Sequence, residues 1–97
     1  MDSNIITISC AAIKYSTTFA PKIDEIVTGN SHADCISWFS MAGIWKKDRV
    51  NEVQGFMTNK GDFVGREKAY TIAEKAGQLI APNTNRVLYS ENVNYII

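Results

Sequence analysis

The chemistry available to this chain centres on its one histidine, His32, and on the cysteine three positions later, Cys35. Residues at i and i+3 share a face of a helix, so the two could form a Cys–His nucleophile pair. The sequence indicates no third group to orient the imidazole, and the alternative is that His32 packs or hydrogen-bonds at a helix start. Four carboxylates could act as acid and base, but no pattern places two of them in one pocket: Asp24, Glu25, Asp34 and Glu52. We therefore expect solvated carboxylates and no catalytic group.

Motifs of cofactor and metal sites are also missing from the sequence. There is no Walker loop, no G-x-G-x-x-G, no nucleophile elbow and no zinc spacing. Cys10 and Cys35 lack the spacing of a redox pair, and free cysteines of this kind are usually buried thiols. We therefore expect a protein that needs no cofactor or metal and that is not an enzyme.

An aromatic residue and a cation are the better candidates for binding. Phe56 and Phe63 flank a predicted hairpin turn, where an aromatic ring can stack on a base or pack across the strands. Arg66 follows the hairpin and opens a predicted helix, where a cation is unfavourable for the helix dipole. An arginine beside a helix N-terminus suits a phosphate or carboxylate ligand. Phe56 and Arg66 are thus predicted ligand contacts, with packing as the alternative for Phe56.

The pattern of apolar residues, turn residues and caps predicts an α+β domain. Ser31 and Asp34 form a variant capping box at a helix start, and Gly43 is a candidate helix stop. The inner face of the second helix carries Ala69, Ile72, Ala73 and Ala76. The predicted order is two ββα units, which indicates an antiparallel sheet with two helices packed on it. The predicted strands are 5–14, 22–28, 52–58 and a short one from 63, and the helices start at 31 and 66.

Length and charge limit the function classes. The 97 residues suit a single domain, 1–97, and the ten basic residues balance ten acidic ones. A balanced charge argues against gripping duplex nucleic acid, although two or three local cations can still bind a small phosphate ligand. With no signal peptide and no membrane span in the sequence, we expect a cytosolic protein with no membrane partner.

Two tryptophans close together, Trp38 and Trp45, exceed what one helix face of a small domain needs. They predict either a subunit interface or two core residues.

The chain carries T-G-x-x-H at Thr28, Gly29 and His32, and L-x-S-E ending at Glu91. Between them runs Q-G-F-x-T-x-x-G-x-F-V-x-R-x-x-A-x-x-I-A-x-x-A-G-Q over 54–78. This series resembles small phage anti-defence proteins, the first-described type of Thoeris anti-defence sponge. The resemblance covers about two-thirds of the chain. It departs from the family at Asn30 and Ser31, where basic residues are common, and at Gly65, where Asp or Asn is common.

The resemblance implies a phage protein that acts in the cytoplasm of the host cell. Such sponges bind cyclic ADP-ribose isomers made by TIR enzymes, and some hold cyclic oligonucleotides, without cleaving them. They assemble as homo-oligomers, including hexamers. The alternatives are a small module that inhibits a host enzyme by binding it and an enzyme that cleaves the signal with His32. The predicted ligand-binding residues are Phe56, Arg66, Asn30, His32, Arg86, Glu91 and Asn92.

Overall fold

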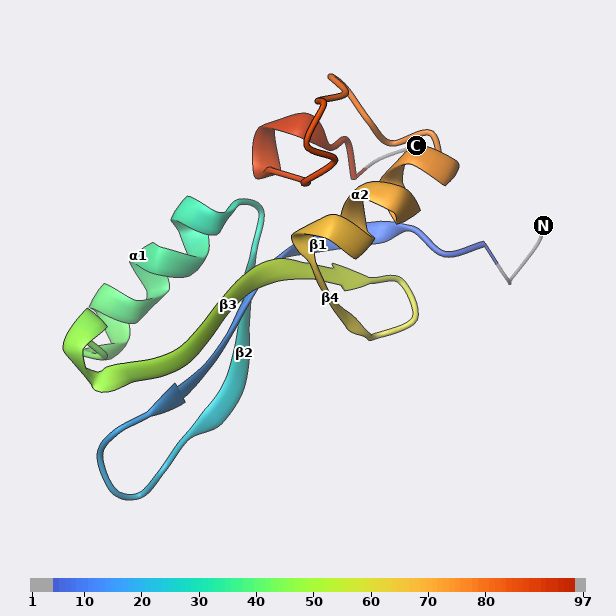
Figure 1. Ribbon diagram of the computed structural model, residues 1–97. Helices are drawn as coiled ribbons and strands as arrows, with labels where there is room; N and C mark the ends of the chain where they lie inside the picture. The colour runs from blue at the N-terminus through green and yellow to red at the C-terminus, as the bar shows by residue number, and fades with distance from the viewer. Residues whose placement is uncertain (1–4, 96–97) are drawn as a thin grey trace.

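A four-stranded antiparallel sheet forms the centre of the protein. The computed structural model describes residues 5–95. The sheet runs in the order β2-β1-β3-β4, with every neighbouring pair antiparallel (Figure 1). Its strands are β1 (Ile8–Thr17), β2 (Asp24–Gly29), β3 (Arg49–Thr58) and β4 (Phe63–Gly65).

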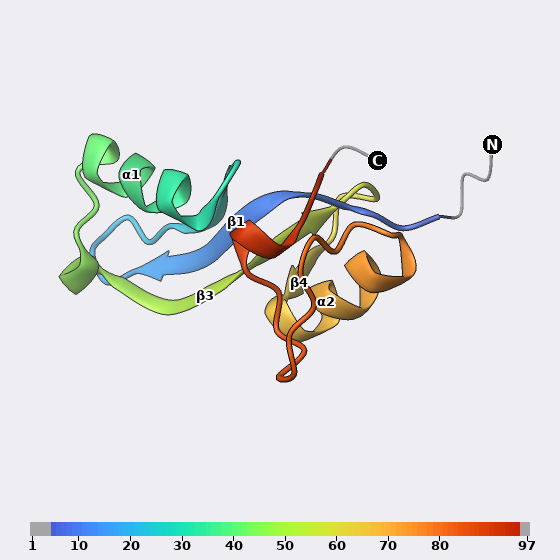
Figure 2. The same ribbon diagram turned by 90° about the horizontal axis from the view of Figure 1, so that it is seen from above.

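Both helices lie on the same side of the sheet in Figure 1. Helix α1 (His32–Ala42) packs on β1 and β2, and helix α2 (Arg66–Lys75) packs on β3 and β4. From above, the helices occupy opposite ends of the sheet, with the C-terminal segment beside α2 (Figure 2). The predicted α+β class, with two ββα units and two packed helices, is confirmed.

Local chemistry sets the helix and turn boundaries as predicted. The Ser31 hydroxyl accepts a hydrogen bond from the Asp34 backbone N–H at 3.2 Å, which caps the start of α1. Gly43 follows α1 with φ 71°, in the left-handed region that a helix stop requires. Gly61 takes φ 85° in the turn between β3 and β4. These positions suit glycine because a side chain would be strained there.

The strand ends differ from the prediction. The first strand was expected over 5–14 but extends to Thr17, and the third was expected from Glu52 but begins at Arg49. Ser16 and Thr17 fall in the turn expected between the predicted strands 5–14 and 22–28, yet each pairs with β3, opposite Val50 and Arg49. Cross-strand pairing therefore outweighs the turn preference of Ser and Thr. The register shifts between Lys14 and Ser16, and the non-glycine residue Asn51 has φ 55° opposite this shift.

The C-terminal segment completes the core. Leu88 and Val93 are buried there, although the sequence pattern of 87–97 predicts only an irregular or short-strand tail. The Gln78 side chain is fully buried and exchanges two hydrogen bonds of 2.8 Å with the backbone of Ile8. Its amide also donates to the Asn94 carbonyl at 3.2 Å. One side chain thus joins the end of α2, the first strand and the C-terminal segment.

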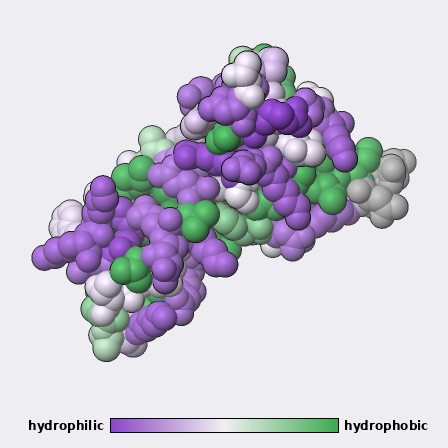
Figure 3. Space-filling model, in the orientation of Figure 1, coloured by the Kyte–Doolittle hydropathy of each residue, from purple (hydrophilic) through white to green (hydrophobic). Residues whose placement is uncertain are grey.

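Several large apolar side chains remain at the surface. On the face seen in Figure 3, apolar patches alternate with hydrophilic ones. Trp38 is 40% exposed and Trp45 is 55% exposed, so the alternative of two core tryptophans is wrong. Among residues 5–95, no helix has the length and apolar content needed to cross a bilayer.

Candidate functional site

His32 is held in one orientation at the start of α1. Its ring is buried, with Nε2 2.7 Å from the Gly55 carbonyl oxygen and Nδ1 3.0 Å from the Ser90 hydroxyl. Because a carbonyl can only accept, Nε2 carries the proton and Nδ1 accepts from Ser90. The Ser90 oxygen accepts in turn from the His32 backbone N–H at 3.0 Å. These bonds select the neutral imidazole with its proton on Nε2.

The surroundings of His32 also favour the neutral ring. Burial is the main cause that lowers its pKa below the ordinary value, and the positive charge of Arg66 acts in the same direction. The hydrogen bond to Gly55 and the charge of Glu91 oppose this shift. His32 therefore acts as a fixed hydrogen-bonding group near neutral pH.

Arg66 begins α2 and reaches toward the same place. Its Nη2 donates to the Gln54 side-chain oxygen at 2.5 Å and lies 3.4 Å from His32 Nδ1. The guanidinium carbon lies 5.1 Å from the centre of the Tyr89 ring. Arg66 Nε is buried and has no hydrogen-bond partner among the described residues. We call His32, Gln54, Arg66, Tyr89 and Ser90 the Arg66 cluster.

The positive charge of Arg66 has no ion-pair partner among the described residues, although the charge of Glu91 acts on the neighbouring His32. No carboxylate within residues 5–95 forms an ion pair with Arg66. The residue before it, Gly65, gives α2 no side-chain cap, so the helix N-terminus adds partial positive charge. An open hollow of about 540 Å³ lies beside this helix start, lined by Gly65, Arg66, Glu67, Lys68 and Val87. Contacts of His32 with Arg66 and Ser90 bring together the starts of both helices and the C-terminal segment, whose ribbons are seen in Figure 1.

The structure brings together only part of the predicted site. His32 and Arg66 lie within hydrogen-bonding distance, and the charge of Glu91 acts on His32. Asn30 is exposed in the connection between β2 and α1. Asn92 closes the 3₁₀ turn Ser90–Asn92, where its Oδ1 accepts from the Tyr89 N–H at 3.2 Å.

Two predicted ligand contacts are engaged elsewhere. Phe56 is fully buried, with its ring edge-on to His32 at 4.9 Å between centres. Stacking of Phe56 on a base is therefore wrong for this structure, and the packing alternative holds. Arg86 forms an ion pair with Glu74 at 2.8 Å and lies over the Tyr70 ring.

The Cys–His nucleophile does not form. Cys35 is fully buried, and its Sγ lies 3.8 Å from the Val27 carbonyl oxygen. Burial, with smaller contributions from Cys10 and Asp34, raises the pKa of the Cys35 thiol to about 11. A thiol that stays protonated at neutral pH is a poor nucleophile.

Sequence reasoning did not place Gln54, Tyr89 and Ser90 together. Gln54 and Ser90 stand in the motifs quoted above, and nothing in the sequence singles out Tyr89. Their proximity depends on the return of the C-terminal segment to the sheet, which no local pattern indicates. The motif L-x-S-E draws attention to Ser90, but it does not indicate that His32 is the residue to which Ser90 bonds.

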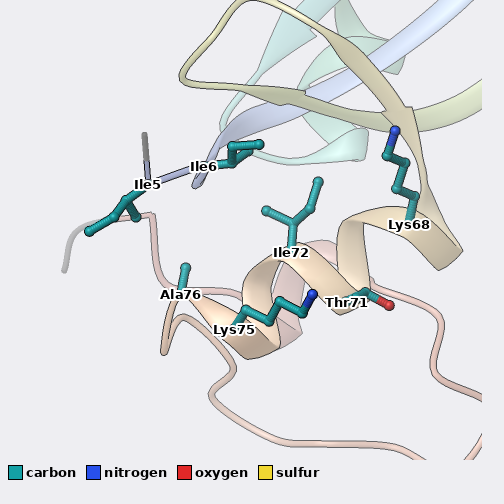
Figure 4. Close-up of a pocket in the computed structure, with 7 residues that line it drawn as sticks. All are labelled: Ile5, Ile6, Lys68, Thr71, Ile72, Lys75 and Ala76. Carbon is teal, nitrogen blue, oxygen red and sulfur yellow. The ribbon is translucent and has the colours of Figure 1, made fainter. Parts of the chain in front are cut away.

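A second hollow lies on the other side of α2 (Figure 4). It has a volume of about 470 Å³ and is mainly apolar, with two lysines on its helical wall. Its lining residues are Ile5, Ile6, Lys68, Thr71, Ile72, Lys75 and Ala76. None of the predicted ligand-binding residues lies in this groove.

A comparison with known protein families identifies the chain. The family model described as phage T4 y16D protein matches residues 7–94. The chain belongs to this family. It is therefore a phage protein, as the resemblance implied. No curated protein and no solved structure matches it.

We expect the stability of this y16D family member to fall as the pH drops from about 6.5. The folded pKa of His32 is lowered, so the unfolded chain takes up a proton first. The stability contributed by the neutral His32 is fully present above the pKa of His32 in the unfolded chain. It is lost as the pH falls toward the pKa of His32 in the folded protein. Urea unfolding of wild type and His32→Gln at several pH values measures it, because His32 is the only histidine. An identical pH dependence in both proteins between pH 5 and 7 would contradict the neutral, buried ring.

Proposed function

We propose that this phage protein binds a small anionic nucleotide at the Arg66 cluster and does not cleave it. The observation that carries the proposal is Arg66 itself: a partly buried guanidinium at a helix N-terminus, with no carboxylate partner among the described residues. A phosphate there would receive charge-assisted hydrogen bonds and favourable interaction with the helix dipole. Tyr89, beside the guanidinium, offers an aromatic face for a base.

The resemblance to Thoeris anti-defence sponges narrows the ligand class. It favours a cyclic ADP-ribose isomer, or a cyclic oligonucleotide, that the phage protein removes from a host defence pathway. A sponge requires affinity and no chemistry. The neutral His32, with its proton bonded to the Gly55 carbonyl, fits a positioning role.

The Ser90–His32 pair supports a second candidate, an enzyme that cleaves the same signal. Ser90 Oγ lies 3.0 Å from His32 Nδ1, a distance that suits transfer of the hydroxyl proton to the ring. The Gly55 carbonyl would orient the imidazole from the other side. Against this role, Ser90 also bonds the His32 backbone N–H, which gives it a structural task at the start of α1.

Ligand recovery separates the two candidates. The protein is incubated with the products of a TIR enzyme, desalted and heated, and the released nucleotide is weighed by mass spectrometry. A sponge releases intact ligand in proportion to protein, and Ser90→Ala still retains it. An enzyme yields a product of different mass, which Ser90→Ala abolishes. If the protein retains no nucleotide and forms no product, the proposal fails.

Arg66→Ala should weaken nucleotide binding by about 1.5–3 kcal/mol, the usual range for hydrogen bonds to charged groups. The fold should persist, because a cation in the first turn does not help the helix dipole. Titration calorimetry and thermal unfolding on the same preparation measure both properties.

Lys47→Ala is the control for lost charge, since Lys47 is exposed in the short 3₁₀ turn Lys46–Asp48, which follows the end of α1 away from His32. It should bind like the wild type. Arg66→Ala binding as tightly as Lys47→Ala would place the ligand elsewhere. Unfolding of Arg66→Ala along with lost binding would assign Arg66 a structural role instead.

A further inference from the structure

The outer edge of the sheet at β2 is open. β2 pairs with β1 on one side and is the last strand of the sheet on the other. Within residues 5–95, the backbone of β2 makes no hydrogen bond outside this pairing, apart from the weak contact of Cys35 Sγ with Val27 O. A hollow of about 250 Å³ runs along 25–28 and is bordered by Trp38 of α1. An unprotected edge of this kind is a template for another strand.

The helix beside this edge has an exposed surface without charge. From Cys35 to Trp45 the sequence contains no charged residue. Trp38 is 40% exposed, and Met41, one turn later, is 87% exposed. Depletion of charge together with exposed aromatic and Met side chains is typical of the centre of a protein interface.

The charges along β2 match a second copy in the antiparallel direction. Its two acids, Asp24 and Glu25, stand at the beginning of the strand, and residues 26–29 carry no charge. Antiparallel self-pairing centred on Ile26 or Val27 places each acid opposite uncharged residues of the other copy. It also keeps the two Asp24 side chains apart. A parallel arrangement would bring like charges together.

We propose that two copies of this chain pair along β2, antiparallel and related by a two-fold axis perpendicular to the sheet. The pairing extends the sheet across both copies and places α1 beside its counterpart, which buries Trp38 and Met41. On the other face, Ile26 of one copy meets Ile26 or Thr28 of the other. The proposal does not depend on nucleotide binding at the Arg66 cluster.

Molecular mass in solution tests the assembly. Light scattering over a range of concentrations should give about twice the chain mass of 10.8 kDa, or an even multiple of it. Met41→Arg should raise the dissociation constant at least tenfold. Ile80→Arg is the matched control, because Ile80 is an exposed isoleucine beyond α2, and it should assemble like the wild type. A wild-type monomer at all concentrations, an odd-numbered oligomer, or equal effects of both variants would overturn the proposal.

Two substitutions of opposite charge at the same position test the direction of pairing. Thr28 is exposed and faces away from α1. If the pairing is centred on Ile26, Thr28 lies directly opposite Asp24 of the other copy. If it is centred on Val27, Thr28 and that Asp24 are diagonal neighbours. Thr28→Lys should therefore retain or tighten assembly, and Thr28→Glu should weaken it at least tenfold at low salt. Circular dichroism confirms that both variants fold. Equal dissociation constants for the two variants would exclude antiparallel pairing along β2.

Discussion

Phe56→Ala should lower the free energy of unfolding by about 3–5 kcal/mol, the range for deletion of a large buried aromatic ring. Phe56 has no exposed surface and stands on β3 opposite Val64 of β4. Its ring also contacts the ring of His32, so the cavity would open beneath the Arg66 cluster. Urea unfolding measures this loss of stability, provided that the dependence of the unfolding free energy on urea concentration is the same in the variant and the wild type.

Two further variants make the test specific. Phe63, on the neighbouring strand, is partly exposed, so Phe63→Ala should cost less than Phe56→Ala. Phe56→Tyr adds a hydroxyl that must find a partner in the core or lose stability. If Phe56→Ala is as stable as the wild type but binds nucleotide poorly, the ring is a ligand platform, and the buried position described above is wrong.

Turns and helix ends were predictable because their causes are local. Ser31 caps α1 through a neighbour three residues away, and Gly43 and Gly61 occupy backbone conformations that glycine adopts without strain. Strand ends were less predictable, since Ser16 and Thr17 belong to β1 only through partners on β3. The long-range pairing is not encoded in a short window of sequence.

In the candidate site, too, residues with a local cause were predictable and residues brought together by long-range contacts were not. Arg66 could be identified because a cation at a helix start is unfavourable unless something else stabilises it. Its neighbours could not, because Ser90 lies 58 positions from His32 and reaches it only after the C-terminal segment folds back. Phe56 was ambiguous from sequence, since a ring near a hairpin turn can face solvent or the core. In the structure the Phe56 ring faces the core, because it is buried beneath His32 and opposite Val64.

Gln78→Leu should destabilise the protein by about 2–4 kcal/mol, although leucine nearly matches the volume of glutamine. The Gln78 amide satisfies the N–H and the carbonyl of Ile8 at 2.8 Å each, inside the core. A leucine leaves these two backbone groups without their partner, and a buried unsatisfied group costs about 1–3 kcal/mol. Gln54→Leu is the control, because Gln54 is only partly buried and water can replace its bond.

Gln78→Glu gives a test whose sign is fixed by pH. A carboxylate can accept from the Ile8 N–H but cannot donate to the Ile8 carbonyl, whereas a protonated carboxyl can do both. Full burial should raise the folded pKa of this glutamate above its unfolded value. The stability deficit of Gln78→Glu relative to wild type should therefore be largest at neutral pH and shrink as the pH falls through the raised pKa. A deficit that does not change between pH 7 and pH 4 would mean that residue 78 reaches water and does not join β1 to the C-terminal segment.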